Sequence, residues 1–416
     1  MSSATTTTID PILKQLYNPS LVGDMTYKSR PFFGLLQKPT NFFGRNMPIP
    51  IKYARPMGRS ASFTYAQTNA APSAYEDFLL TRVSDYCIAT IDGEASEASE
   101  SQIGAFVSAA AQEIDGAMES LADAIESFLF GTGAGALATV GSESTTSLTL
   151  ADINDVTRFE VGMVLVVSAT DGAAVRSGTQ TISGINRTTG VLTAGTNWTT
   201  GISALIAGDY IYVQGDAANA GSNVKISGFQ AWCPAATPAA TSFFGVNRTV
   251  DSRLYGLYHD GTAGTVEEAL IDAQSKAGRE GASPDVAIIN NVQMRRLIKE
   301  LGSKRDYVQV MAQGAQAKGG AEAPVNVGYR AVVIQGDKDI MHVVSANKAP
   351  SAIGLVLESD TWTFPALGMH TKFLMRDGNK ILRQASADGD EIRVAFRGNL
   401  GCKAPGHNVH VALPAA

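Results

Sequence analysis

The fold is decided by residues 94–130, which read EASEASESQIGAFVSAAAQEIDGAMESLADAIESFLF. Apolar residues recur along this stretch with the i, i+3/i+4, i+7 spacing of one helical face. They are Ile103, Phe106, Val107, Ala110, Ile114, Ala117, Leu121, Ile125, Phe128 and Leu129. Gly131 follows where glycine commonly ends a helix. About 33 helical residues would span roughly 50 Å, so the sequence predicts one long amphipathic helix with an acidic outer face.

The segment before this helix has the opposite charge. Residues 1–59 hold Lys14, Lys28, Arg30, Lys38, Arg45, Lys52, Arg55 and Arg59 against only Asp10 and Asp24, whereas residues 76–130 hold twelve acids and one base. Eight prolines in the first 72 residues exclude a packed helical layer. Large apolar residues such as Phe32, Phe33 and Phe43 exclude a disordered tail. We expect a basic arm that docks on an acidic surface of a neighbouring copy; the alternative is an arm that folds back on its own chain.

The remaining chain divides by composition. Residues 1–46 are the arm, and residues 47–92 read as an extended hairpin with strand-like stretches at 48–53, 61–65 and 78–91. Residues 139–222 are rich in Thr, Ser, Gly and Val and contain no proline. Their short strands, at 147–150, 163–168, 180–185, 190–193 and 210–213, predict a small inserted β-barrel or sandwich. The alternative is that these strands belong to the main sheet.

Residues 223–359 read as a mixed α/β domain. Helices are predicted over 266–279 and 292–301, with strands over 285–290, 330–335, 339–345 and 352–358. Residues 361–411 read as antiparallel strands. The sequence therefore predicts an α+β protein of several lobes, in which 93–138 and 360–416 form one domain.

The sequence shows no pattern of catalysis or metal binding. The five histidines lack paired-ligand spacing, no nucleophile motif occurs, and the glycine-rich stretch 131–135 lacks the GK[ST] ending of a phosphate loop. Three scattered cysteines predict free thiols in a protein made in the cytosol. No secretory signal or membrane-spanning run is recognised. We therefore expect no enzyme activity, no cofactor and no metal.

The order of these parts resembles the major capsid protein of tailed bacteriophages, whose shell fold is named for phage Hong Kong ninety-seven. Residues 75–92, YEDFLLTRVSDYCIATID, resemble the hairpin return that leads into the family's spine helix, and residues 128–133, FLFGTG, resemble the end of that helix. Residues 226–230, ISGFQ, resemble the strand that follows, and residues 285–297, DVAIINNVQMRRL, resemble a strand–helix unit of the axial domain. The resemblance covers all but 140–222, an insertion that most members lack.

The resemblance implies a shell subunit that self-assembles as pentamers and hexamers around double-stranded phage DNA. Its peripheral domain would be 93–138 with 360–416, and its axial domain 223–359. Portal and scaffold proteins, and a decoration protein, would be its partners, with assembly in the host bacterial cytoplasm and a final place in the virion. An encapsulin-like nanocompartment shell is the alternative; a β-rich adhesin fits less well because no signal peptide is seen.

The expected subunit contacts follow from charge. We expect Phe32, Phe33, Arg45, Lys52, Arg55 and Arg59 of the arm and hairpin to contact a neighbour, and Glu94, Glu97, Glu100 and Asp115 to form the acidic helix face that receives them. Individual exposed ion pairs contribute only about 0–1 kcal/mol. Aromatic side chains would therefore supply most of the free energy of such a contact.

Overall fold

The computed structural model describes residues 29–94, 109–217, 223–302, 332–335, 340–375, 381–384 and 388–415. These residues mix helices with strands, as predicted, and fall into two compact units. Unit 1 contains residues 86–94, 109–123 and the described part of 371–395, and unit 2 contains the other described residues.

Unit 1 combines a helix with a four-stranded sheet. The helix is α5 (Ala109–Leu129), whose last six residues belong to unit 2. The strands are β3 (Val83–Asp92), β18 (Lys372–Phe373), β19 (Ile381–Arg383) and β20 (Gly389–Gly398), in the order β18-β20-β19 with β3 paired to β20. Ala117 and Leu121 are buried and keep the predicted four-residue spacing. The predicted helix is thus present from Ala109 onward, and residues 95–108 lie outside the described residues.

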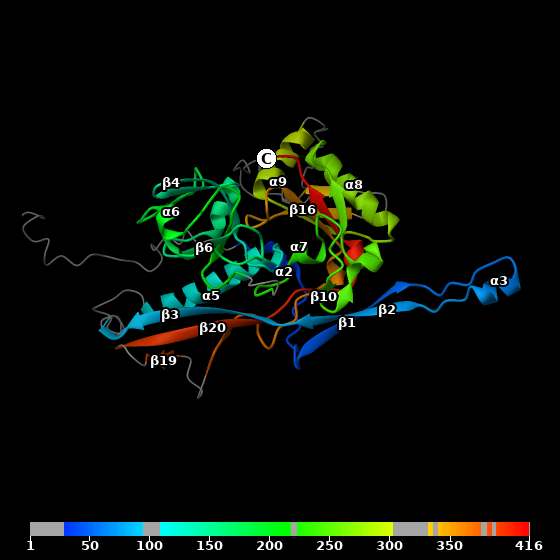
Figure 1. The fold of residues 1–416 in the computed structure, drawn as a ribbon, viewed down its shortest axis with the longest axis horizontal. Helices are drawn as coiled ribbons and strands as arrows, with labels where there is room; N and C mark the ends of the chain where they lie inside the picture. The colour runs from blue at the N-terminus through cyan, green and yellow to red at the C-terminus, as the bar shows by residue number, and fades with distance from the viewer. Residues whose placement is uncertain are drawn as a thin grey trace, which may run out of the picture. The chain divides into compact units, whose positions relative to one another are not determined.

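In unit 2, β1 (Asn46–Ala54) and β2 (Ala74–Thr81) form the predicted hairpin. The strands pair antiparallel, with Ile49 opposite Phe78 and Lys52 opposite Tyr75. Figure 1 shows the hairpin reaching away from the rest of its unit, with helix α3 (Phe63–Thr68) at its far end. The prediction of a strand at 61–65 is therefore wrong. Its aromatic and β-branched residues favour a strand locally, but the segment closes a helical turn, in which Ala66 N donates to Ser62 O at 3.0 Å.

Unit 2 also contains a closed β-barrel. Its strands are β4 (Ala138–Ser144), β5 (Ser147–Leu150), β6 (Val164–Ser168), β7 (Gln180–Asn186), β8 (Val191–Ala194) and β9 (Tyr210–Val213), in the order β4-β5-β8-β7-β6-β9. The 3-10 helix η3 (Ile153–Arg158) and helix α6 (Trp198–Gly201) connect strands. The barrel agrees with the small all-β structure predicted here, and the pairing excludes the alternative that these strands extend the main sheet. Arg158 holds the barrel on the neighbouring loop, because Nη2 donates to Lys348 O at 2.8 Å.

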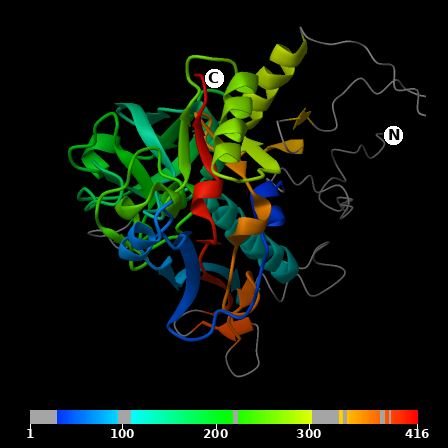
Figure 2. The ribbon, with the colours of Figure 1, turned by 90° about the vertical axis from the view of Figure 1, so that its right-hand side faces the viewer.

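The largest sheet carries the helices predicted for the mixed α/β region. Its strands β12 (Leu257–Asp260), β13 (Val286–Ile289), β14 (Val332–Gln335), β15 (Ile340–Ser345), β16 (Ile353–Leu357) and β22 (Val409–Ala412) take the order β12-β22-β16-β13-β15-β14. Helices α8 (Val266–Arg279) and α9 (Asn291–Gly302) lie side by side in Figure 2. Leu270, Ala273 and Leu297 of these helices share a core with Met341 and Val356 of the sheet. Thr265 and Glu268 form a capping box that starts α8.

Strand β22 corrects the boundary drawn at residue 360. It pairs parallel with β12 and antiparallel with β16, so residues 409–412 belong to the largest sheet rather than with helix α5. The pairing joins segments about 150 and 55 residues apart in sequence, and no local pattern reveals such a pairing.

The remaining elements are short. They are α2 (Pro31–Leu35), α7 (Phe229–Trp232), β10 (Ser242–Phe243), β11 (Val246–Asn247), β17 (Trp362–Thr363), β21 (Gly401–Cys402) and the 3-10 helices η4 (Arg248–Val250), η5 (Ser252–Leu254), η6 (Ser359–Thr361) and η7 (Pro405–His407). The strand expected at 226–230 is absent: residues 226–228 are irregular, and α7 begins at Phe229. A Cβ at Gly228 would lie 2.4 Å from the carbonyl oxygens of Phe128 and Leu129, so glycine permits a close backbone approach there.

Candidate subunit interface

The hairpin is firmly attached at its base. Phe78 and Leu80 of β2 are fully buried, and the Phe78 ring lies 5.1 Å from Trp232 and 6.3 Å from Phe243, centroid to centroid. The Arg248 guanidinium lies 4.0 Å from the Phe243 ring centroid, and its Nη1 donates to Ala231 O at 2.7 Å. Burial lowers the pKa of Arg248 to about 10. The hairpin base is therefore part of the protein core.

The far end of the hairpin has no such cover. Phe63 is 81% exposed, and Tyr65, Met57 and Tyr75 are also exposed. An isolated two-stranded hairpin is marginally stable in water, and exposed apolar groups are typical of surfaces that bind a partner. We call this end, residues 52–75, the hairpin tip.

The expected cations lie on the exposed part of the hairpin and before it. Arg45, Lys52, Arg55 and Arg59 are all exposed. The Lys52 ammonium lies 5.5 Å from the ring centroid of Tyr75, its cross-strand partner, so the cation is already associated with an exposed aromatic ring. The hairpin tip thus combines aromatic surface with positive charge.

The expected acidic partners lie in unit 1. Glu94 and Asp115 are exposed there, and Glu97 and Glu100 lie outside the described residues. The hairpin cations belong to unit 2. Contact between the two sets across a subunit boundary stays a prediction.

Phe32 and Phe33, which we expected at a subunit contact, pack against residues of their own chain, and Phe33 stays partly exposed. Phe32 is 0% exposed, with its ring 5.2 Å from Phe130 and 6.4 Å from Trp362. The Phe33 ring lies 6.1 Å from Phe364. For residues 29–45 the alternative prediction, an arm folded on its own chain, describes what is observed. Residues 1–28 lie outside the described residues.

A buried glutamate that the sequence did not single out fixes this part of the arm. Glu126 of α5 is fully buried and accepts hydrogen bonds from Phe32 N at 3.1 Å and Phe33 N at 2.7 Å. The carboxylate thereby binds the first N–H groups of α2, which have no partner within the helix. Lys38 lies 4.1 Å from the Phe33 ring, and burial lowers its pKa while the nearby Glu126 opposes that shift. In the sequence Glu126 is indistinguishable from the exposed acids of the same helix.

A second group that the sequence did not reveal lies beside the barrel. The Lys225 ammonium is 2.9 Å from an oxygen of Asp85 and 2.9 Å from an oxygen of Asp216, and 4.9 Å from the Phe128 ring. Its side chain is 7% exposed. Burial raises the pKa of Asp216, and the neighbouring Lys225 partly offsets that rise. This triad joins the chain leaving the barrel to the start of β3.

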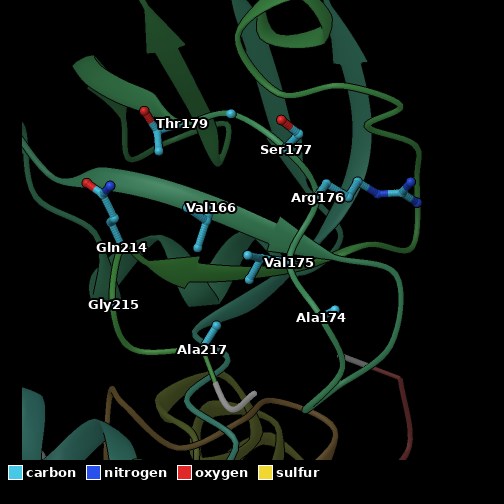
Figure 3. A pocket seen from close by; sticks show the side chains of 10 residues that line it. Val166, Ala174, Val175, Arg176, Ser177, Thr179, Gln214, Gly215 and Ala217 are labelled. Atoms are coloured by element: carbon cyan, nitrogen blue, oxygen red, sulfur yellow. The ribbon is translucent and has the colours of Figure 1, made fainter. Parts of the chain in front are cut away.

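The described surface offers little that resembles a catalytic site. A cavity of about 490 Å³ on the barrel is lined by Val166, Val175, Ser177, Thr179 and Gln214, and Figure 3 shows the Arg176 side chain directed away from it. Arg176 instead pairs with Asp209 at 2.7 Å. Among the described residues no group of three or more His, Cys, Asp or Glu could hold a metal, and none of the helices there is long and apolar enough to span a membrane.

Comparison with solved structures places this fold. The chain superimposes on a chain of the cyanophage A-1(L) capsid asymmetric unit with a TM-score of 0.56 and 12% sequence identity, covering 98% of this chain and 99% of the other. This chain has a phage capsid fold. No protein-family model matches the sequence, and no curated protein matches it either.

Two further structures are similar over nearly the whole chain. A chain of Mycobacterium phage Bobi has a TM-score of 0.47 and 10% identity, covering 100% of both chains. An encapsulin complex from Synechococcus elongatus has a TM-score of 0.46 and 8% identity, covering 99% of this chain and 96% of the other. Both of these scores lie below 0.5, so the capsid fold is argued from the cyanophage comparison.

Proposed function

We propose that this chain is the major capsid protein of a tailed bacteriophage. It self-assembles as pentamers and hexamers into an icosahedral shell around double-stranded DNA. The observation that carries the proposal is the likeness to the cyanophage capsid chain, which extends over 98% of this chain and 99% of that one. The exposed aromatic hairpin tip supports it, because a surface of that kind gains stability from a neighbouring subunit.

In this proposal α5 is the spine helix of a shell fold of the Hong Kong ninety-seven type. The hairpin is its extended loop, residues 1–46 its arm, and the barrel an inserted domain that faces outward, away from packaged DNA. Unit 1 would correspond to much of the peripheral domain and the largest sheet to the axial domain. Portal, scaffold and decoration proteins would be its partners, and the mature subunit would reside in the virion after assembly in the host cytoplasm.

The hairpin cations would contact the acidic helix of a neighbour. Lys52, Arg55 and Arg59 are exposed on the hairpin, and Glu94 and Asp115 are exposed in unit 1, so both partners of the proposed contact are accessible in the single chain. The aromatic side chains of the tip would supply apolar burial beside these ion pairs. The role of the chain would be structural rather than catalytic.

The test is assembly of the purified chain. The protein is expressed without other phage proteins, and its products are separated by sedimentation and imaged by electron microscopy. Closed shells or tubes with pentameric and hexameric units are expected. A chain that remains monomeric at high concentration, with and without a macromolecular crowding agent, overturns the proposal.

The encapsulin alternative makes a different prediction for shell contents. An encapsulin shell encloses a protein cargo, whereas a phage shell packages DNA. The similarity to the encapsulin chain has a TM-score of 0.46 and gives no support of its own. The contents of particles from the natural source, protein or double-stranded DNA, separate the two.

A further inference from the structure

The two long edges of the hairpin are not equivalent. In β1, Pro48 and Pro50 lie opposite Leu79 and Asp77 of β2. Proline has no N–H to donate, so in a strand it is accommodated where that N–H would point away from the paired neighbour. Both prolines therefore lie with their nitrogens on the outer edge of β1. That edge lacks two donors that a third strand would need.

The outer edge of β2 is intact. Leu79 N donates to Phe244 O at 2.8 Å, outside the hairpin, so the Leu79 amide points away from β1. Alternate residues of an antiparallel strand point the same way, and the register is regular from Asn46 to Lys52. The amides of Asp77 and Tyr75 therefore also point outward. Neither amide has a hydrogen-bond partner within the part of the chain that the structure describes.

The chain itself already adds a short piece to this edge. The turn that carries Phe244 connects β10 and β11, and its backbone accepts a hydrogen bond from β2 at Leu79, next to the hairpin base. The following residue, Gly245, lies beside Leu79 and close to the carbonyl oxygen of Asp77. Phe244 takes a φ of +49°, which bulky residues rarely adopt. Beyond Leu79 toward the tip, the side chains of Asp77 and Tyr75 are exposed.

We propose that the outer edge of β2 at Tyr75 and Asp77 receives an extended strand from a second copy of this chain, so that the hairpin becomes a three-stranded sheet. The inference rests on the proposed shell function, which brings copies into contact. Three strands are the usual minimum for a stable sheet, and backbone pairing along an exposed edge is a general mode of association.

Charge indicates which kind of strand the second copy contributes. Glu76 and Asp77 are consecutive on β2 and point to opposite faces, so pairing of two β2 edges would place like charges near one another on both faces. The contact is therefore between different segments of the two copies rather than between two β2 edges. Residues 1–59, with eight Lys and Arg against two Asp, have the complementary charge.

The first test is hydrogen exchange at single-residue resolution, before and after assembly of the wild-type chain. Glu76 and Phe78, whose amides face β1, should exchange slowly in both states. Tyr75 and Asp77 should exchange fast in the unassembled chain and at least tenfold more slowly in the assembled one. Fast exchange at Tyr75 and Asp77 in assembled particles overturns the edge proposal while leaving the capsid proposal intact. A wild-type chain that never assembles overturns both.

The second test uses matched proline variants. Asp77→Pro removes one outward donor from the β2 edge and no hydrogen bond within the hairpin, so assembly should fall at least tenfold. Asp77→Asn, which keeps the amide and removes the charge, should assemble at near the wild-type level. Asn46→Pro makes the same change on the opposite edge, since Asn46 has the same alternation as Pro48 and Pro50, and should assemble normally.

Folding of each variant is checked separately from assembly. The near-ultraviolet signal of Trp232 at the hairpin base should be unchanged in all three unassembled variants. Equal assembly of Asp77→Pro and wild type overturns the proposal, as does equal loss in Asp77→Pro and Asn46→Pro. If the Tyr75 and Asp77 amides are protected from exchange only when a different protein is added, that protein occupies the edge. Pairing with a second copy is then overturned.

Discussion

The barrel and the hairpin are both β structures of unit 2, yet they treat their polar and charged groups in opposite ways. The barrel closes on itself, and its arginines find carboxylates within it: Arg158 with Asp155, Arg176 with Asp209 and Arg187 with Glu160. The hairpin leaves its cations and aromatic rings exposed beyond a buried base. The barrel thus pairs its arginines within itself, whereas the hairpin presents the groups that the proposed subunit contact would use.

The largest loss of stability is expected from a substitution at the base of the hairpin, compared with one at its tip. Phe78→Ala should lower the free energy of unfolding by about 3–5 kcal/mol, because it empties a fully buried aromatic site. Phe63→Ala, at an 81% exposed position, should change it by less than about 0.5 kcal/mol but impair assembly. Urea unfolding followed by tryptophan fluorescence measures the first effect, and sedimentation the second. Equal destabilisation by both variants would remove the distinction between base and tip.

A somewhat smaller effect is expected inside the barrel. Arg176→Ala removes the cation that pairs with the nearly buried Asp209 carboxylate, which then keeps its hydrogen bond from Ile206 N at 3.0 Å. The free energy of unfolding should fall by about 3 kcal/mol. Thermal and urea unfolding measure the loss.

The matched barrel control is Glu160→Ala, which breaks the exposed pair with Arg187 and should cost less than about 1 kcal/mol. Neither change touches the hairpin, so the folded fraction of both variants should still assemble. Failure of assembly in a folded Arg176→Ala chain would show that the barrel also needs a partner.

The triad beside the barrel should show a modest dependence on pH. Burial raises the pKa of Asp216 above its ordinary 3.8, so the folded chain retains a proton that the unfolded chain has released. The retained proton therefore stabilises the folded chain at pH values below the ordinary pKa of the carboxyl. This stabilisation is lost as the pH rises through the pKa of Asp216 in the folded chain. Asp216→Asn lacks this titration. Its stability relative to the wild type should therefore improve between pH 4 and pH 7, as measured by urea unfolding at both values.

The smallest effect per molecule is expected from the exposed cations. Replacing Lys52, Arg55 and Arg59 by alanine should leave the stability of the single chain within about 0.5 kcal/mol of wild type. Assembly should require a higher protein concentration and should lose part of its salt dependence, because each exposed pair contributes about 0–1 kcal/mol. Light scattering at several salt concentrations measures this. An unchanged salt dependence would contradict the assigned contact.

The sequence predicts best where local pattern and tertiary structure agree. Helix α8 occupies the predicted residues 266–279, and strands β5 and β9 occupy the predicted 147–150 and 210–213. Alternation within a strand and a capping box at a helix start are local properties that survive folding.

The errors lie where distant segments decide. Residues 61–65 are rich in strand-forming side chains, but they pair with no strand among the described residues, and 63–65 begin helix α3. Phe32 was expected at a subunit contact, and only the distant Phe130, Trp362 and Glu126 reveal that its place is within its own chain. The exposed cations could be predicted because charge itself favours the surface. Lys225 could not, because its carboxylate partners Asp85 and Asp216 are not its neighbours in the sequence.

Pro48 and Pro50 also bear on how far association can proceed. A two-stranded hairpin with two open edges can pair with a neighbour on each side. Identical copies can then stack through their edges without limit, as they do in cross-β fibrils. The two prolines on the β1 edge leave this hairpin with one edge, that of β2, which can pair. Copies held at high local concentration therefore cannot stack hairpin on hairpin through both edges, which disfavours fibres of the cross-β kind.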